Sequence, residues 1–199
     1  MFQSGKSSGS LKSANSAVWE ASIFRTDLGW IGVAGRQGVL CRLTLGHANE
    51  HAARRALHLA YAGEIRDRHW SPDLRQRLEI YASGAVVDLS DIPRHLEART
   101  PFQARVLELT IAVPFGATVT YGELAEQAGF PRAARAVGTV MSSNVIPLVI
   151  PCHRVVGAQG GLGGYSAPQG VRLKHRLLAL EAMAVGNPLP SRAVRMAAP

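Results

Sequence analysis

Short apolar runs in the first part of the chain alternate with turn residues and predict strands joined by hairpins. The runs lie at residues 18–26, 30–34 and 38–45, and an Asp-Leu-Gly turn separates the first two. After them, apolar residues recur at helical spacing within residues 52–60, which predicts a helix. These elements predict a small β-meander backed by helices.

A second helix is predicted after this meander. Ser71 suits the N-cap, Pro72 suits the first helical position, and Asp73 adds an early acidic residue. Gly84 is suited to end this helix. Together, the strands and helices predict an N-terminal α+β domain at residues 17–91.

The second half of the chain shows helical periodicity and short loops. Pro101 begins a predicted helix, and the Pro-Phe-Gly sequence at residues 114–116 ends it. The apolar stripe of this helix consists of Phe102, Val106, Leu109 and Val113. Residues 92–100 carry several charges, with Pro93 inside the segment and Pro101 directly after it, and this composition predicts a linker. We therefore expect a second domain at residues 101–185.

Two short helices with a tight turn between them are predicted within this second domain. Thr120 stands three residues before Glu123, which is a capping box for the first of them. Pro131 is expected to begin the second helix, which would carry Arg132 and Arg135. The pattern predicts a helix-turn-helix whose second helix enters the major groove of DNA. A helical hairpin that merely packs, with solvated arginines, is the alternative.

Charge is distributed unevenly along the chain, which has 199 residues and a formal net charge of +8. The balance is zero in residues 17–97 and +4 in residues 98–185, and each predicted flexible tail, at 1–16 and at 186–199, adds +2. The excess of positive charge therefore lies in the half that carries the predicted helix-turn-helix and in the tails, which favours a polyanion such as nucleic acid as the partner. A basic surface without such a partner is the alternative.

Two cysteines, Cys41 and Cys152, are too few for a disulfide framework and indicate a reducing compartment. We therefore expect an intracellular protein, cytoplasmic in a bacterium and nuclear in a eukaryote. No run approaches the ~20 apolar residues that span a bilayer, so no membrane is expected as a partner. His47 and His51 stand near Cys41 but lack a fourth ligand, so no metal site is predicted.

Cys152 directly precedes His153 in an apolar segment, which makes the cysteine a candidate nucleophile. A buried structural thiol is the alternative for a free cysteine. Adjacent side chains in an extended segment point to opposite faces, so the histidine is not expected to reach the sulfur directly. The pair alone therefore does not establish catalysis.

Residues 120–181 carry several short motifs in a defined order. Asn144 stands eight residues before Cys152, and the motifs are TYGELA at 120–125, AARAVG at 133–138, PCHRVV at 151–156, GYS at 164–166 and LLALE at 177–181. In order and spacing, this part of the chain closely resembles the 6-O-alkylguanine-DNA alkyltransferases, also called methylated-DNA–protein-cysteine methyltransferases. The first half fits the variable α+β domain of that family only in outline.

The resemblance implies both a fold and a reaction. The fold is α+β, with a ribonuclease-H-like N-terminal meander and a helical C-terminal domain that holds a winged-helix-like helix-turn-helix and an active-site loop. The reaction is direct-reversal DNA repair without a cofactor. A methyl or larger alkyl group moves irreversibly from the exocyclic oxygen of guanine, and less well of thymine, to Cys152. The expected protein is a self-inactivating monomer, with cooperative binding along DNA left open.

By the resemblance, Cys152 is the nucleophile, and the pKa of its thiol must be effectively lowered. His153 acts as a base through a bridging water, and Glu181 orients the imidazole and stabilises its protonated form. Asn144 is expected to hold the surrounding turn through side-chain-to-backbone hydrogen bonds. Tyr121 would donate its hydroxyl proton to a guanine ring nitrogen as charge develops on the leaving group.

The resemblance also implies how guanine is held. Main-chain carbonyls of Cys152 and Val155 would accept hydrogen bonds from the guanine amino group. The amide of Ser166 would serve the guanine oxygen, and Tyr165 would form part of the pocket wall. Taken singly, Tyr121 and Tyr165 would be interpreted as ordinary core aromatics.

Duplex DNA carrying an alkylated guanine is the expected partner, because a stacked base must rotate out before it can react. Arg135 matches the arginine of the family that enters the vacated stack. The family places this helix in the minor groove, which replaces the major-groove expectation. The other expected DNA contacts are Thr120, Arg132, Ala134 and Gly138.

The chain departs from the family at Val145, where proline usually follows the asparagine. This change is expected to loosen a turn beside the pocket without removing a reacting group. Two other functions stay open on the residues themselves. One is a DNA-binding sensor or regulator whose thiol is dispensable. The other is a cysteine hydrolase that uses Cys152, His153 and Glu181, although it does not explain the basic second half.

Overall fold

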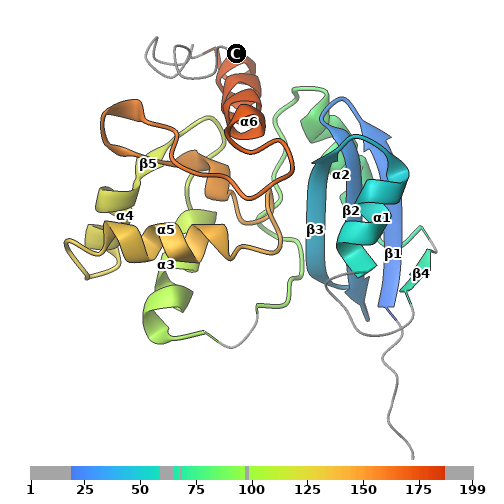
Figure 1. Ribbon diagram of the computed structural model, residues 1–199, viewed down its shortest axis with the longest axis horizontal. Helices are drawn as coiled ribbons and strands as arrows, with labels where there is room; N and C mark the ends of the chain where they lie inside the picture. Colours follow the sequence, from blue (N-terminus) through green and yellow to red (C-terminus); the bar gives the residue numbers. More distant parts are fainter. Residues whose placement is uncertain (1–18, 59–64, 68, 97–98, 187–199) are drawn as a thin grey trace, which may run out of the picture.

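The computed structural model describes residues 19–58, 65–67, 69–96 and 99–186, which form a mixed α+β fold (Figure 1). The predicted tails at 1–16 and 186–199 lie outside these residues, apart from Gly186. No helix in the described ranges is long and apolar enough to cross a membrane.

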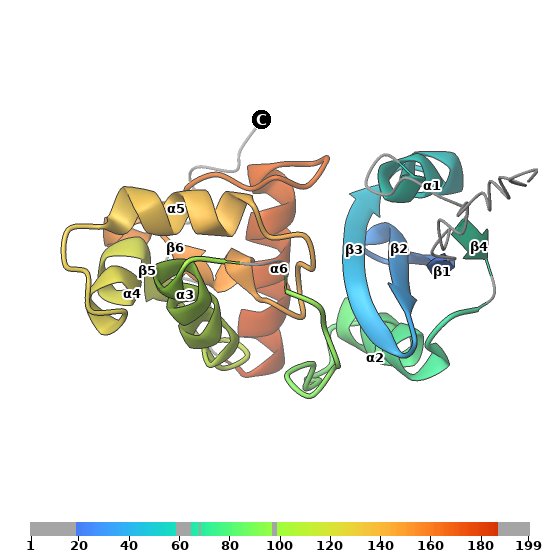
Figure 2. The ribbon, with the colours of Figure 1, turned by 90° about the horizontal axis from the view of Figure 1, so that it is seen from below.

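Strands β1 (Trp19–Thr26), β2 (Gly29–Arg36) and β3 (Val39–His47) form the antiparallel meander that the sequence predicts. A fourth strand, β4 (Ile65–Asp67), adds to β1 in parallel and gives the order β3-β2-β1-β4. This strand has three residues, too few for a recognisable alternation of apolar and polar positions. Figure 2 shows β3 at the edge of the sheet that faces the second half of the chain.

Helices α1 (Glu50–His58) and α2 (Pro72–Ala82) lie on opposite faces of this sheet (Figures 1 and 2). Pro72 occupies the start of α2 as predicted, but the side chain of Ser71 makes no capping hydrogen bond. Ser71 has a φ of 53°, in the left-handed region, whereas a capping serine usually has an extended backbone. Ser71 therefore occupies the predicted N-cap position, but its side chain does not cap the helix. Gly84 follows α2 with a φ of 94°, which suits its predicted place.

The second half begins with α3 (Pro101–Ile111), which starts at Pro101 as predicted. Its N-cap is Thr100, and a reciprocal pair of hydrogen bonds with Gln103 forms a capping box that the apolar pattern did not show. Val106 is fully buried on this helix, in agreement with the predicted stripe.

Helix α4 (Tyr121–Gln127) begins at the predicted capping box, in which Thr120 and Glu123 exchange hydrogen bonds. Helix α5 (Ala134–Ser142) begins later than predicted. Arg132 has a φ of 75°, which is incompatible with a right-handed helix, so Pro131 and Arg132 belong to the turn that precedes α5. The prediction that both arginines lie on one helix is wrong.

The candidate nucleophile lies in a tight turn between two longer helices. Residues Cys152–Arg154 form the 3₁₀ turn η1, so the extended conformation expected for this segment is wrong. Strand β6 (Val155–Val156) follows and pairs in parallel with β5 (Val119–Thr120). A second 3₁₀ turn, η2 (Ala158–Gly160), leads to a loop that ends at α6 (Val171–Ala184). The β5–β6 pair holds the start of α4 beside the cysteine turn.

The two halves share one connected cluster of buried apolar side chains. The edge strand β3 also bonds directly to the second half, because the amide of Leu43 donates to the carbonyl of Val145 at 3.0 Å. Gln169 donates to the carbonyl of Gly46 at 2.8 Å, just before α6. A side chain on Gly46 would come within 2.6 Å of Leu173, so β3 and α6 approach closely there. The predicted domain boundaries stay predictions.

Candidate active site

A cavity of about 730 Å³ opens between α4, α5, η1 and the loop that follows η2. Eight of the residues predicted to act on DNA or guanine line it: Thr120, Tyr121, Ala134, Arg135, Gly138, Cys152, Tyr165 and Ser166. Tertiary folding thus brings together segments that are separated by up to 46 positions in the chain. The cavity is large enough for a nucleobase, since small-molecule sites typically occupy ~300–1,000 Å³.

Cys152 is 6% exposed and lies at the wall of this cavity. Burial raises the pKa of its thiol, while the side chain of Asn144 and the ammonium of Lys174 act in the opposite direction. The thiol is therefore neutral in the resting protein, and the expected lowering of its pKa is not found there. A thiolate at this position has to be formed by transfer of its proton to a neighbouring base.

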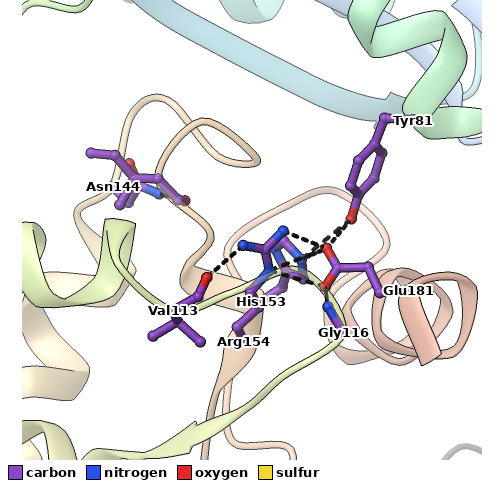
Figure 3. A network of polar contacts seen from close by, with 8 residues as sticks. Tyr81, Val113, Gly116, Asn144, His153, Arg154 and Glu181 are labelled. Carbon is purple, nitrogen blue, oxygen red and sulfur yellow. Dashed lines mark hydrogen bonds and ion pairs between the residues drawn. The ribbon is translucent and has the colours of Figure 1, made fainter. Parts of the chain in front are cut away.

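His153 is fully buried behind the cysteine, and its Nε2 lies 2.8 Å from Oε1 of Glu181 (Figure 3). The other ring nitrogen, Nδ1, is buried and has no hydrogen-bond partner among the described residues. Burial lowers the pKa of His153, although Glu181 opposes this shift. The imidazole is therefore neutral near pH 7, with Nδ1 as its free basic nitrogen if Nε2 carries the proton.

Glu181 accepts hydrogen bonds from four different residues, three of which the sequence did not indicate. Nε and Nη2 of Arg154 lie 2.9 Å from Oε2 and 3.0 Å from Oε1, and the amide of Gly116 lies 3.0 Å from Oε2. The hydroxyl of Tyr81, which comes from α2, donates to Oε1 at 2.7 Å (Figure 3). Burial alone would raise the pKa of Glu181, but bonds from His153 and Arg154 hold it well below its usual range.

Lys174 is a further buried cation that the sequence analysis missed. Its Nζ donates to the carbonyl of Val155 at 2.6 Å and to the hydroxyl of Tyr121 at 3.4 Å. Burial lowers the pKa of Lys174 to about 8, against the effect of Cys152. The sequence did contain a sign that Lys174 is buried. It follows Leu173 and stands three residues before Leu177, which places it on the buried face of α6.

The Val155 carbonyl, predicted to bind the guanine amino group, is thus already bonded to this lysine. A carbonyl oxygen has two lone pairs, so a second donor can still bind. Val155 itself is fully buried and does not line the cavity.

Asn144 holds a turn beside the cysteine in the manner that the sequence predicts. Its amide nitrogen donates to the carbonyl of Ile150 at 2.9 Å, and its carbonyl oxygen accepts from the amide of Ile146 at 3.1 Å. A second cavity of about 220 Å³ is lined by this turn and by β3, and it shares Cys152 and Tyr165 with the larger one. This second cavity therefore lies between the cysteine and the edge of the sheet.

The two arginines predicted to contact DNA differ in position. Arg135 is exposed on α5 and lines the larger cavity, whereas Arg132 is exposed in the preceding turn and does not line it. The hydroxyl of Ser166 donates to the carbonyl of Ser142 on α5 at 3.2 Å, which ties the loop to that helix. The hydroxyl of Tyr165 is buried and has no partner within the described ranges.

The residues considered for a metal lie in the N-terminal half. Cys41 and His47 are buried in β3, where the thiol approaches the carbonyl of Val39 and the imidazole bonds to Thr44, and His51 is exposed on α1. Across the ranges that the structure describes, no group of three or more His, Cys, Asp or Glu side chains could hold a metal ion.

Comparisons with known proteins agree with this geometry. Residues 101–183 match the family described as 6-O-methylguanine DNA methyltransferase, DNA binding domain. The methylated-DNA–protein-cysteine methyltransferase of Mycobacterium bovis is 40% identical over 147 residues, which are 70% of this chain and 85% of that protein. The relative of that name from Metallosphaera sedula is 44% identical over 115 residues, which are 58% of this chain and 70% of that protein.

Solved structures show the same similarity. The O6-methylguanine methyltransferase of Mycobacterium tuberculosis superposes with a TM-score of 0.68 and 30% identity, covering 88% of this chain and 99% of that one. The OGT of the same organism, solved in complex with DNA, gives a TM-score of 0.66 and 32% identity, covering 83% and 94%. The cysteine turn, its buried histidine and glutamate, and these matches lead to one conclusion. The chain belongs to the methylated-DNA–protein-cysteine methyltransferase family.

Proposed function

We propose that this protein binds duplex DNA, takes an alkylated guanine into the larger cavity and moves the alkyl group onto the sulfur of Cys152. The observation that carries the proposal is the position of Cys152, at the cavity wall in front of the buried His153–Glu181 pair. The family relationship supports DNA repair by alkyl transfer to cysteine. The DNA complex of the mycobacterial OGT supports DNA as the partner.

The proposed reaction is an in-line displacement at carbon. A water that bridges Sγ of Cys152 and Nδ1 of His153 carries the thiol proton to the imidazole, since Nε2 already faces Glu181. The sulfur then forms a bond to the alkyl carbon as the bond from that carbon to the guanine oxygen breaks. The electron pair of the broken bond goes to the purine.

The charge that develops on the purine needs a proton. Tyr121 lines the cavity and supplies it from its hydroxyl to a ring nitrogen of the base. Lys174 lies 3.4 Å from that hydroxyl, and with a pKa of about 8 it is charged at neutral pH and can return the proton. The products are guanine and a thioether. A thioether has no hydrolytic exit, so each molecule acts once and needs no cofactor.

Recognition of guanine is assigned to backbone groups beside the same cavity. Carbonyls of Cys152 and Val155 would accept from the exocyclic amino group, and the amide of Ser166 would bind the oxygen. Thymine lacks that amino group, so its alkylated form is expected to react less well. Tyr165 would pack against the base.

DNA is assigned to the surface of α5. Arg135 is exposed at the cavity, which suits a side chain that fills the stack after the nucleotide rotates out. Contact through the minor groove is supported by the small residues Ala134 and Gly138, which allow the DNA backbone to come close. Arg132, which lies in the turn before α5, would contact a phosphate. We expect the protein to act as a monomer.

Peptide mass measurement tests this proposal. The purified protein is incubated with an equal amount of duplex that contains one 6-O-methylguanine, then digested. A gain of one methyl group on the peptide that carries Cys152 is expected. The Cys152→Ala variant should bind the duplex with unchanged affinity and gain no methyl group. Repair of many lesions by one molecule, or modification at another residue, would contradict the proposal.

A further inference from the structure

One contact joins the N-terminal half directly to the buried residues behind the cysteine. Tyr81, near the end of α2, is 1% exposed, and its hydroxyl donates to Oε1 of Glu181 at 2.7 Å. The same hydroxyl lies 3.3 Å from Nε2 of His153. Figure 3 shows the tyrosine pointing from α2 toward the glutamate on α6 and the histidine of the cysteine turn.

Packing alone does not account for a tyrosine at this place. The ring of Tyr81 packs edge-on against Phe115, with centroids 5.8 Å apart, and a phenylalanine would make the same contact. A buried hydroxyl without a partner destabilises the fold, so its orientation is fixed by the acceptor it finds. The acceptor here is the carboxylate that orients the histidine.

We propose that Tyr81 is a positioning residue for the alkyl transfer, through which the N-terminal half fixes Glu181 and limits the proton affinity of His153. The inference rests on the proposed function of the Cys152 site. Tyr81 does not line the cavity and touches no reacting atom, so it acts through Glu181 and His153.

Three donors share one carboxylate oxygen of Glu181. Oε1 of Glu181 accepts from Tyr81, from Nε2 of His153 and from Nη2 of Arg154. Each donor withdraws electron density, so removing the neutral hydroxyl leaves a stronger acceptor for the imidazole N–H. A stronger acceptor favours the protonated imidazole, which can no longer take the proton of the thiol.

The other charges around the imidazole stay unchanged when this hydroxyl is removed. Arg154 and Lys174 disfavour the protonated imidazole, and Glu181 favours it. The thiol of Cys152 precedes the histidine in η1, and the pKa of the Tyr165 hydroxyl is raised by burial and by the charges of Cys152 and Glu181. A change in the titration of His153 after loss of one hydroxyl therefore reports on Tyr81 itself.

The test variant is Tyr81→Phe in the full chain, with free 6-O-benzylguanine as the substrate so that DNA binding does not enter. The rate constant for modification of Cys152 is measured from about pH 5 to about pH 9. We expect a rate about three- to tenfold lower at pH 7, from looser placement of the histidine. We also expect the acidic limb to move about half a unit to one unit higher, because a hydrogen bond to the charged carboxylate is lost.

Arg176→Ala is the matched control. Arg176 donates to the carbonyl of Asp27 and so joins α6 to the N-terminal half without touching the glutamate. This variant should keep the wild-type pH profile. If it shifts the acidic limb as Tyr81→Phe does, general loosening between the halves explains the effect and the inference fails.

An NMR titration of His153 tests the effect of the Tyr81 hydroxyl independently of alkyl transfer. The His153 signal is assigned by its absence from the spectrum of a His153→Gln variant. A higher pKa in Tyr81→Phe than in the wild type supports the inference. An unchanged value would show that the hydroxyl is only structural. A lower value would show that it accepts from the imidazole instead, and either result overturns the inference. If wild-type Cys152 is never alkylated, the proposed function fails, while this titration still reports on Tyr81.

Discussion

Lys174 is expected to lower the stability of the folded protein while it speeds alkyl transfer, so replacing it should separate stability from activity. The lysine is 0% exposed, and burial lowers its pKa from 10.5 to about 8. A shift of this size corresponds to about 3 kcal/mol of cost for keeping the charge buried at pH 7. Lys174→Met removes that cost, but it leaves the carbonyl of Val155 without its donor, which costs about 1–3 kcal/mol. The net change in the free energy of unfolding is thus a gain of roughly 0–2 kcal/mol.

Activity should change in the opposite direction. Lys174 favours the thiolate of Cys152, whose pKa burial raises. A nearby opposite charge moves a pKa by about one to three units, so its loss should slow alkyl transfer at pH 7 about tenfold or more. Lys174→Gln is the control for the hydrogen bond, since it keeps a donor for the carbonyl of Val155 but carries no charge. It should be as slow as the methionine variant.

The pH dependence of both stability and rate follows from the lowered pKa of Lys174. Between pH 8 and pH 10.5 the folded protein has lost the proton of Lys174 while the unfolded chain keeps it, so wild-type stability rises with pH relative to Lys174→Met. The stability advantage of the methionine variant should therefore shrink over this range in urea unfolding experiments. The ratio of wild-type to variant transfer rates should fall above pH 8, as the lysine becomes neutral. A rate ratio that stays constant from pH 6 to pH 9, or an unfolding free energy several kcal/mol lower in the variant, would refute this reasoning.

Three further predictions follow from single contacts. Arg154→Met should lower the free energy of unfolding by about 3–5 kcal/mol in urea titrations, because it leaves a buried carboxylate without its cation. Gly163→Ala places a methyl group 2.7 Å from the hydroxyl of Tyr121 and should slow alkyl transfer about tenfold. Gly160→Ala has a similar positive φ but no neighbour within 4 Å, so it should retain the wild-type rate. Arg135→Ala should slow repair of duplex DNA at least about tenfold more than reaction with free 6-O-benzylguanine, and equal losses would count against its role in base extrusion.

Features that depend on near neighbours in the chain were predictable from the sequence. The capping box of Thr120 and Glu123 was found because its two hydrogen bonds join residues three apart. The meander was found because strand alternation and turn residues are local signals. The family resemblance implied the turn made by Asn144, whose side chain bonds to backbone groups within six residues. The candidate nucleophile was found through a contiguous motif.

Predictions from local sequence were wrong where a segment can adopt several conformations and tertiary packing selects one of them. Pro131 is allowed at the first position of a helix, but the left-handed backbone of Arg132 delays α5 to Ala134. The segment at Cys152 was expected to be extended, yet its carbonyl and amide groups close a 3₁₀ turn. Short segments of this kind have several conformations of similar energy, and their neighbours in space select one.

The sequence by itself determined which cysteine is the candidate nucleophile and which family the chain resembles, because both depend on contiguous motifs. The tertiary structure alone decided what surrounds the reacting groups. Tyr81 and Glu181 are 100 residues apart, and Lys174 meets the carbonyl of Val155 from a different element. Contacts between distant positions leave no periodic trace in a single chain, and the pKa of each buried group depends on those contacts.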